Sequence, residues 1–206
     1  MAAPNLKDFD RVLIVEGYSD LLFFAEFFEA IGKPSSVFIK QFGGKSDLVE
    51  KLEAFINPQL LKEKTRIGLV VDADISAEGT FISLQTRLTK LTGQMVPASG
   101  QWSGGTPDIG IFVTPDNAGQ GEIETLVWHA WAADDANQEA KTCIRSYERD
   151  MKAAGFEAQS PDKGRIGVLL AIRNDDDPRL GPGARANVFD FTRPEFEALR
   201  AFLSAF

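Results

Sequence analysis

The stretch Val12-Leu13-Ile14-Val15-Glu16-Gly17-Tyr18-Ser19-Asp20 decides the fold. Four β-prone apolar residues end at a carboxylate and a glycine, and an apolar, helix-like segment follows from Leu21 to Ile31. This pattern is typical of a buried parallel strand that leads into a helix. Open α/β sheets place their ligands at the carboxyl edge, and Glu16 is predicted to lie there. From this stretch alone, Glu16 could equally be a plain turn residue beside the start of the helix.

The rest of the chain repeats the alternation of strand and helix. Strands are expected at 11–15, 37–42, 66–71 and 110–114, and helices at 20–32, 46–57, from Ser76 or Thr80 to about 91, and from 122 onward. Residues 93–108 fit a loop or weak hairpin. Helices follow at 135–155, 163–173 and 195–206, with a polar loop at 175–183. We expect an α/β fold, with a mostly parallel sheet flanked by helices on both faces and a helical C-terminal elaboration.

Length and composition indicate a single domain over residues 1–206, with a core at about 9–130 and a helical part at about 135–206. No apolar run approaches the roughly 18 residues of a membrane span. Residues 1–8 lack the basic and apolar regions of a signal peptide. One cysteine and one histidine argue against disulfides and zinc clusters. A cytoplasmic protein is therefore expected.

The net charge of -8 argues against tight nucleic-acid binding without a metal, because such binders are usually basic. It does not argue against a metal site, since clustered acids that hold magnesium add negative charge themselves. If nucleic acid is the substrate, this acidity indicates that a partner supplies basic surface.

Acidic residues follow three of the expected strands: Glu16, the pair Asp72 and Asp74, and Asp116. In extended backbone, Asp72 and Asp74 point to the same side. Such a pair can hold one hard cation or bridge two, and magnesium prefers oxygen ligands. Clustered carboxylates otherwise repel one another. The alternative is that both aspartates only cap the turn after their strand.

Other polar stretches carry weaker signals. Gly43-Gly44-Lys45-Ser46 does not complete a phosphate-binding P-loop, because Ile39 stands where the first glycine belongs. A strand-to-helix turn fits better, with Lys45 facing the carboxyl edge. His129 is expected to be a packed or partly buried helix residue, and residues 175–177 a solvated acidic loop.

The motif Glu16-Gly17 with Asp20 three residues after the glycine, followed later by Asp72-x-Asp74, resembles the Toprim domain. This is the catalytic domain of topoisomerases and primases, and it occurs also in recombination-repair proteins and overcoming-lysogenisation-defect (OLD) nucleases. The resemblance implies that Glu16 acts as general acid or base and that Asp72 and Asp74 bind Mg²⁺ or Mn²⁺.

The later chain is similar to an uncharacterised Toprim-like family related to OLD nucleases. The similarity lies in residues 114–117, in Gly121-x-x-Glu124-x-Leu126, and in Lys163 before an apolar helix. It implies that Glu16, Asp72, Asp74 and Glu124 bind metal, and that Glu16 and Lys163 are catalytic. Two metal ions can activate water and stabilise the leaving oxygen, and a lysine can neutralise charge on the phosphoryl oxygens.

Simpler readings of these last residues stay open. Glu124 also fits a partner of the helix dipole, and Lys163 a solvated surface lysine. Glu122 lies close enough in the sequence to compete with Glu124 for the same role.

The expected function is metal-dependent hydrolysis of nucleic-acid phosphodiesters, with DNA expected ahead of RNA. No tyrosine is placed for transesterification, which argues against a topoisomerase. The resemblance also implies an ABC/AAA-type ATPase partner, and an oligomer is compatible with it.

Two other functions remain open. One is a haloacid-dehalogenase-like phosphatase, in which Asp72 attacks phosphorus and Asp74 is the acid. Its motif normally continues with Gly-Thr, where this chain has Ile75-Ser76. The other is a Toprim-fold subunit that binds a partner or a phosphorylated ligand without turnover.

Overall fold

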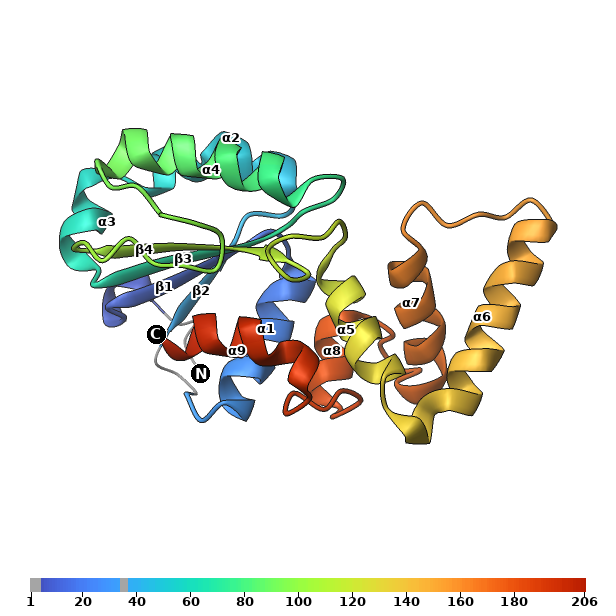
Figure 1. The fold of residues 1–206 in the computed structure, drawn as a ribbon. Helices are drawn as coiled ribbons and strands as arrows, with labels where there is room; N and C mark the ends of the chain where they lie inside the picture. Colours follow the sequence, from blue (N-terminus) through green and yellow to red (C-terminus); the bar gives the residue numbers. More distant parts are fainter. Residues whose placement is uncertain (1–4, 34–36) are drawn as a thin grey trace.

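A parallel sheet of four strands lies at the centre of the computed structural model, which describes residues 5–33 and 37–206 (Figure 1). Its strands are β1 (Arg11–Val15), β2 (Phe38–Gln41), β3 (Arg66–Asp72) and β4 (Asp108–Thr114), in the order β2-β1-β3-β4. Residues 1–4, half of the segment assessed for a signal peptide, lie outside the described residues. Both central strands are almost entirely buried apolar residues, as a sheet covered on both faces requires.

Helices cover both faces of this sheet, because alternate residues of each strand point to opposite sides. Leu13 and Val15 of β1 join one core with residues of α1 (Tyr18–Ala30), α5 (Ile123–Ala132) and α9 (Glu197–Ser204). Val12 and Ile14 join a second core with α2 (Lys45–Phe55), α3 (Pro58–Glu63) and α4 (Ala77–Thr92). The predicted α/β class, parallel sheet and two-sided helical cover are confirmed.

The order of the strands creates a switch point between β1 and β3. The chain leaves β1 through α1 on one face to reach β2, then passes through α2 and α3 on the other face to β3, on the opposite side of β1. Open α/β sheets bind ligands at such a point, outside the carboxyl ends of the strands. Glu16 directly follows β1 and Asp72 ends β3, so both carboxylates lie there.

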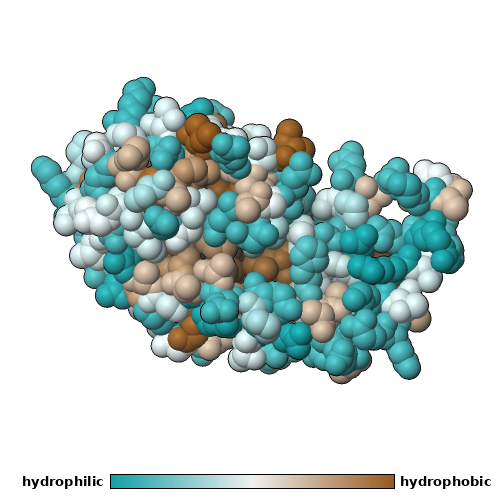
Figure 2. Space-filling view, in the orientation of Figure 1, coloured by the Kyte–Doolittle hydropathy of each residue, from teal (hydrophilic) through white to brown (hydrophobic). Residues whose placement is uncertain are grey.

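The C-terminal part of the chain is helical. After the short 3-10 helix η2 (Asp135–Asn137), α6 (Gln138–Ala153) and α7 (Pro161–Arg173) form a pair that projects from the sheet domain (Figure 1). In Figure 2 hydrophilic residues predominate on the visible face, and the upper outline dips between this pair and the sheet domain. No helix within 5–33 and 37–206 is long and apolar enough to cross a membrane.

Two short helices were not expected. Asn57 accepts hydrogen bonds from the backbone N–H groups of Gln59 and Leu60, so the predicted helix stop also starts α3. α8 (Leu180–Arg185) begins inside the expected loop and packs against α1. A Cβ added to Gly181 would lie 2.4 Å from the Cβ of Leu22, so glycine permits this close contact. The expected C-terminal helix is divided into η3 (Pro194–Phe196) and α9.

Residues 93–108, expected to form a loop or weak hairpin, add no strand to the sheet but supply a tryptophan that packs against the core. Trp102 forms an isolated bridge with Gly110 and stacks on Phe202 of α9, with ring centroids 4.7 Å apart. Gly68 and Gly110 pair across β3 and β4, and a Cβ on either would lie within 3.1 Å of Trp102. The glycine pair therefore provides the space that the indole ring fills.

Candidate functional site

Glu16 and Asp72 are held together across the switch point by backbone and side-chain hydrogen bonds. The backbone N–H of Asp72 donates to Glu16 Oε1 at 2.9 Å. Asp72 Oδ1 accepts from the hydroxyl of Thr114 at 2.7 Å and from the backbone N–H of Ile123 at 2.9 Å. These bonds use one oxygen of each carboxylate and join the ends of β1, β3 and β4 to the start of α5.

Glu122, Glu124 and Lys163 extend this site from the helices. Glu122 is the N-cap of α5 and Glu124 lies in its first turn, while Lys163 lies in the first turn of α7. Lys163 Nζ is 2.8 Å from Glu122 Oε2 and 3.8 Å from Glu124 Oε1. The structure therefore brings the predicted Glu124 and Lys163 together, and it places Glu122 closer to the lysine than Glu124.

Asp20 belongs to the same cluster, although it was not among the predicted site residues. α1 begins at Tyr18, earlier than expected, and Asp20 in its first turn accepts a hydrogen bond from the N–H of Gly17 at 2.8 Å. Burial raises the pKa of Asp20, and the Lys163 charge opposes this effect. The signal for Asp20 was its place three residues after Gly17 in the motif that begins with Glu16. The signal for Glu122 was its position two residues before Glu124.

The carboxylate of Asp74 is paired with Lys45 and not with the clustered acids, whereas the prediction placed it on the same side as Asp72. β3 ends at Asp72, and Asp74 has a positive φ of 51°. Its backbone exchanges two hydrogen bonds of 3.0 Å with Gly121. Its carboxylate meets Lys45 of α2 at 2.6 Å, on the opposite face of the sheet from α5. The prediction assumed extended backbone, which ends two residues earlier.

The structure also shows where three other polar residues lie, namely Lys45, Asp116 and His129. Lys45 does face the carboxyl edge, since its ammonium also donates to the backbone carbonyl of Asp72 at 2.8 Å. Asp116 caps its own turn by accepting from the N–H groups of Ala118 and Gly119, so it stays outside the cluster. His129 is exposed on α5, and the prediction that it is packed or partly buried was wrong.

The clustered carboxylates hold protons more tightly than free ones. Burial and then the neighbouring Asp72 charge raise the pKa of Glu16 to about 7. Burial raises the pKa of Asp72 to about 6, with Asp20 and Glu122 adding repulsion. Burial also raises the pKa of Glu124 to about 7, against the attraction of Lys163. These groups can therefore exchange protons near neutral pH.

The donor set of this cluster suits a hard divalent cation, because it consists of carboxylate oxygens. Among the predicted ligands, Asp72 acts on both Glu16 and Glu124, and Asp20 adds a further carboxylate beside Glu16. Within the described residues, no three acidic, histidine or cysteine side chains are already arranged around one metal position. Metal binding at this edge therefore requires side-chain adjustment.

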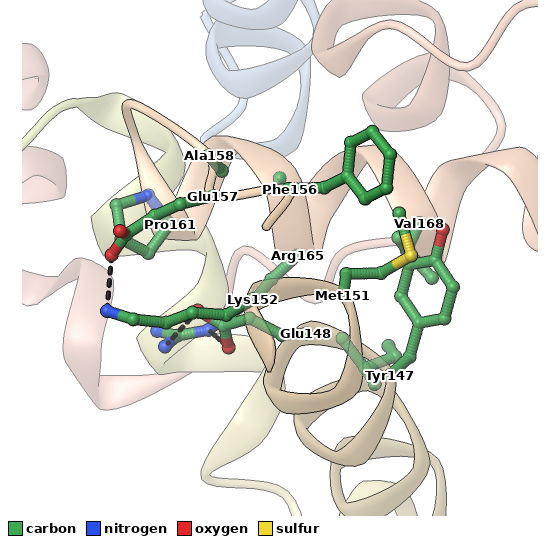
Figure 3. Close-up of a pocket in the computed structure, with 12 residues that line it drawn as sticks. Tyr147, Glu148, Met151, Lys152, Phe156, Glu157, Ala158, Pro161, Arg165 and Val168 are labelled. Atoms are coloured by element: carbon green, nitrogen blue, oxygen red, sulfur yellow. Dashed lines mark hydrogen bonds and ion pairs between the residues drawn. The ribbon is translucent and has the colours of Figure 1, made fainter. Parts of the chain in front are cut away.

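A separate cavity of about 250 Å³ lies between α6 and α7 (Figure 3). Tyr147, Met151 and Val168 lie on its apolar side, as Figure 3 shows. At its edge, Arg165 forms a two-pronged ion pair with Glu148 of α6, with N–O distances of 2.8 and 3.0 Å. Arg165 also forms an ion pair with Asp162 in the first turn of α7, the turn that carries Lys163.

Comparisons with known proteins give the family of the chain and no individual relative. Neither the curated proteins nor the solved structures gave a match. Residues 10–206 match the family described as "Protein of unknown function (DUF3226)", and the chain therefore belongs to this family.

Proposed function

We propose that this chain is a metal-dependent nuclease that hydrolyses nucleic-acid phosphodiesters, with DNA expected ahead of RNA. The observation that carries the proposal is the gathering of Glu16, Asp72 and Glu124 at the switch point, where burial and repulsion from neighbouring acids raise the pKa of each. Perturbed carboxylates gathered at a ligand-binding edge are a frequent mark of function. A divalent cation would neutralise them.

The residues take distinct roles in this proposal. Asp72, Glu124 and Glu16 would hold Mg²⁺ or Mn²⁺, which supplies an activated water and charge stabilisation when bound. Asp74 can join them only after leaving Lys45. Glu16, with a pKa of about 7, suits proton transfer near neutral pH. Lys163 would neutralise charge that develops on the phosphoryl oxygens.

The geometry does not favour the phosphatase alternative. That mechanism needs Asp74 as an acid beside the attacking carboxylate of Asp72. Here Asp72 Oδ1 is engaged by Thr114 and Ile123, and Asp74 is paired with Lys45 on the other face. A basic partner, of the ATPase type that the Toprim resemblance implies, remains part of the proposal because the chain carries a net charge of -8.

The test is cleavage of supercoiled plasmid, single-stranded DNA and RNA by the purified protein with Mg²⁺ or Mn²⁺, and with a chelator as blank. Glu16→Gln and Asp72→Asn should each abolish cleavage. Asp116→Asn is the matched control, because it removes a charge at the same sheet edge from a residue that caps only its own turn. Cleavage that survives Glu16→Gln and Asp72→Asn together would refute the proposal. Absence of both cleavage and Mn²⁺ binding in the wild-type protein would also refute it.

A further inference from the structure

A groove of about 350 Å³ lies between α2 and α4, at the end of β3 and on the opposite face from α5. Its volume falls within the roughly 300–1,000 Å³ of small-molecule sites. Buried apolar side chains form part of the lining, namely Leu48, Val71 and Leu84. Lys45 and Asp74 are its charged lining residues, and Ser83 of α4 lines it as an exposed hydroxyl.

Lys45 connects this groove to the carboxylate cluster. Its ammonium donates to Asp74 Oδ2 at 2.6 Å and to the backbone carbonyl of Asp72 at 2.8 Å. The side chain of Asp72 lies in the cluster, and its neighbour along the chain, Ala73, lines the groove. An anion bound by Lys45 would therefore lie beside the proposed site of hydrolysis.

The present partner of Lys45 can be exchanged for another anion. The side chains of Lys45 and Asp74 are 35% and 48% exposed, and ion pairs at such positions contribute little to stability. A phosphate oxygen accepts the same charge-assisted hydrogen bond from the ammonium as the carboxylate does. The chain is acidic and the carboxylate cluster lies nearby, so an anionic substrate needs positive charge at this place. Lys45, which lines the groove, supplies it.

We propose that the groove binds the nucleotide adjacent to the scissile phosphodiester, with Lys45 on its phosphate and the apolar lining against its base. This inference rests on the proposed function and adds a substrate subsite to it. Lys45 and Lys163 would then contact the substrate from the two sides of the sheet edge.

The test measures binding of a fluorescein-labelled single-stranded DNA octamer by fluorescence anisotropy, with Ca²⁺ as the cation. Lys45→Met removes the charge, and Ser83→Trp fills the groove from an exposed position. Each should weaken binding about tenfold or more, while Ile82→Trp should stay within about twofold. Ile82 is the matched control, because it is 50% exposed next to Ser83 and does not line the groove. Circular dichroism and the melting temperature verify that each variant folds.

Wild-type affinity in either Lys45→Met or Ser83→Trp overturns the inference, and so does an absence of octamer binding by the wild-type protein. If the wild type cleaves DNA and both variants bind the octamer normally, the subsite proposal is wrong and the nuclease proposal is retained. If both variants lose binding and the wild type neither cleaves nor binds Mn²⁺, the groove is a DNA-binding site and the nuclease proposal is refuted.

Discussion

Replacing Glu16 by glutamine should stabilise the metal-free protein at pH 8. The folded state holds this carboxylate in a buried position beside Asp72, which raises its pKa to about 7 from the ordinary 4.5. At pH 8 the group is ionised in both folded and unfolded chains, and only the folded chain has to accommodate the buried charge. Glutamine removes the charge and keeps an Oε1 that can accept the N–H of Asp72.

The size of the effect follows from the pKa. Each pKa unit corresponds to about 1.36 kcal/mol, so the change from 4.5 to about 7 corresponds to about 3 kcal/mol. Burial contributes most of this figure and repulsion from Asp72 contributes the next part, and glutamine removes both. For a chain of this length, about 3 kcal/mol raises the melting temperature by about 6–12 °C.

The effect has a defined dependence on pH. Below about pH 4.5 Glu16 is protonated in both states, and glutamine gives no advantage. Between about pH 4.5 and 7 the folded chain binds a proton that the unfolded chain has lost, so wild-type stability falls as the pH rises. The advantage of Glu16→Gln should therefore grow over this window and be complete above about pH 7.

Urea denaturation in a chelator, followed by circular dichroism from pH 4 to pH 8, measures this difference. Asp116→Asn should give no comparable gain, because Asp116 is exposed and outside the cluster. If Glu16→Gln is no more stable than wild type at pH 8, or if its advantage is the same at pH 4, the electrostatic reasoning fails.

Three further outcomes are expected. Mn²⁺ at about 100 times its dissociation constant should raise the free energy of unfolding by about 2.7 kcal/mol in urea denaturation, and Asp72→Asn should abolish this gain. Gly110→Ala should cost about 1–3 kcal/mol by the same assay without changing cleavage per folded molecule, because its Cβ would lie 2.7 Å from the Trp102 ring. Lys163→Met should slow cleavage about 100-fold and move the acidic limb of the pH–rate profile to higher pH, because Glu124 loses the cation that lowers its pKa.

The sequence was sufficient for the sheet because β1 and β3 are short, β-branched apolar runs that alternate with helical segments, as strands covered on both faces do. Glu16 and Asp72 could be placed at one edge for the same reason, since the carboxyl ends of parallel strands meet there. The strand order, which puts these two strands on the two sides of the switch point, was not predicted.

Local sequence propensity could not predict the helix α8 or the left-handed backbone conformation of Asp74. α8 has the sequence Leu-Gly-Pro-Gly-Ala-Arg, which favours a loop, and it is helical where Gly181 and Gly183 allow close packing on α1 and on Leu170 of α7. Asp74 leaves the extended path because its backbone pairs with Gly121, which is 47 residues later in the chain. Long-range contacts decide both features.

The same limit applies to the choice between Glu122 and Glu124. Spacing placed both near the start of a helix, and the motif favoured Glu124. The position of α7 decides which of them Lys163 meets, and that position is set by packing on α5, α6 and α8. In the structure Lys163 is closer to Glu122, and Glu124 is left as the more readily available metal ligand.

The lysines at this edge suggest how the site responds to a cation. Lys45 neutralises Asp74 from one face, and Lys163 neutralises Glu122 and Glu124 from the other. Each ammonium occupies a place where a metal ion would compete for the same oxygens. A divalent cation that neutralised these acids would release the two lysines from their present partners, and both ammonium groups could then bind an anionic substrate. The acidic chain would thereby present positive charge to nucleic acid only after it has bound its metal.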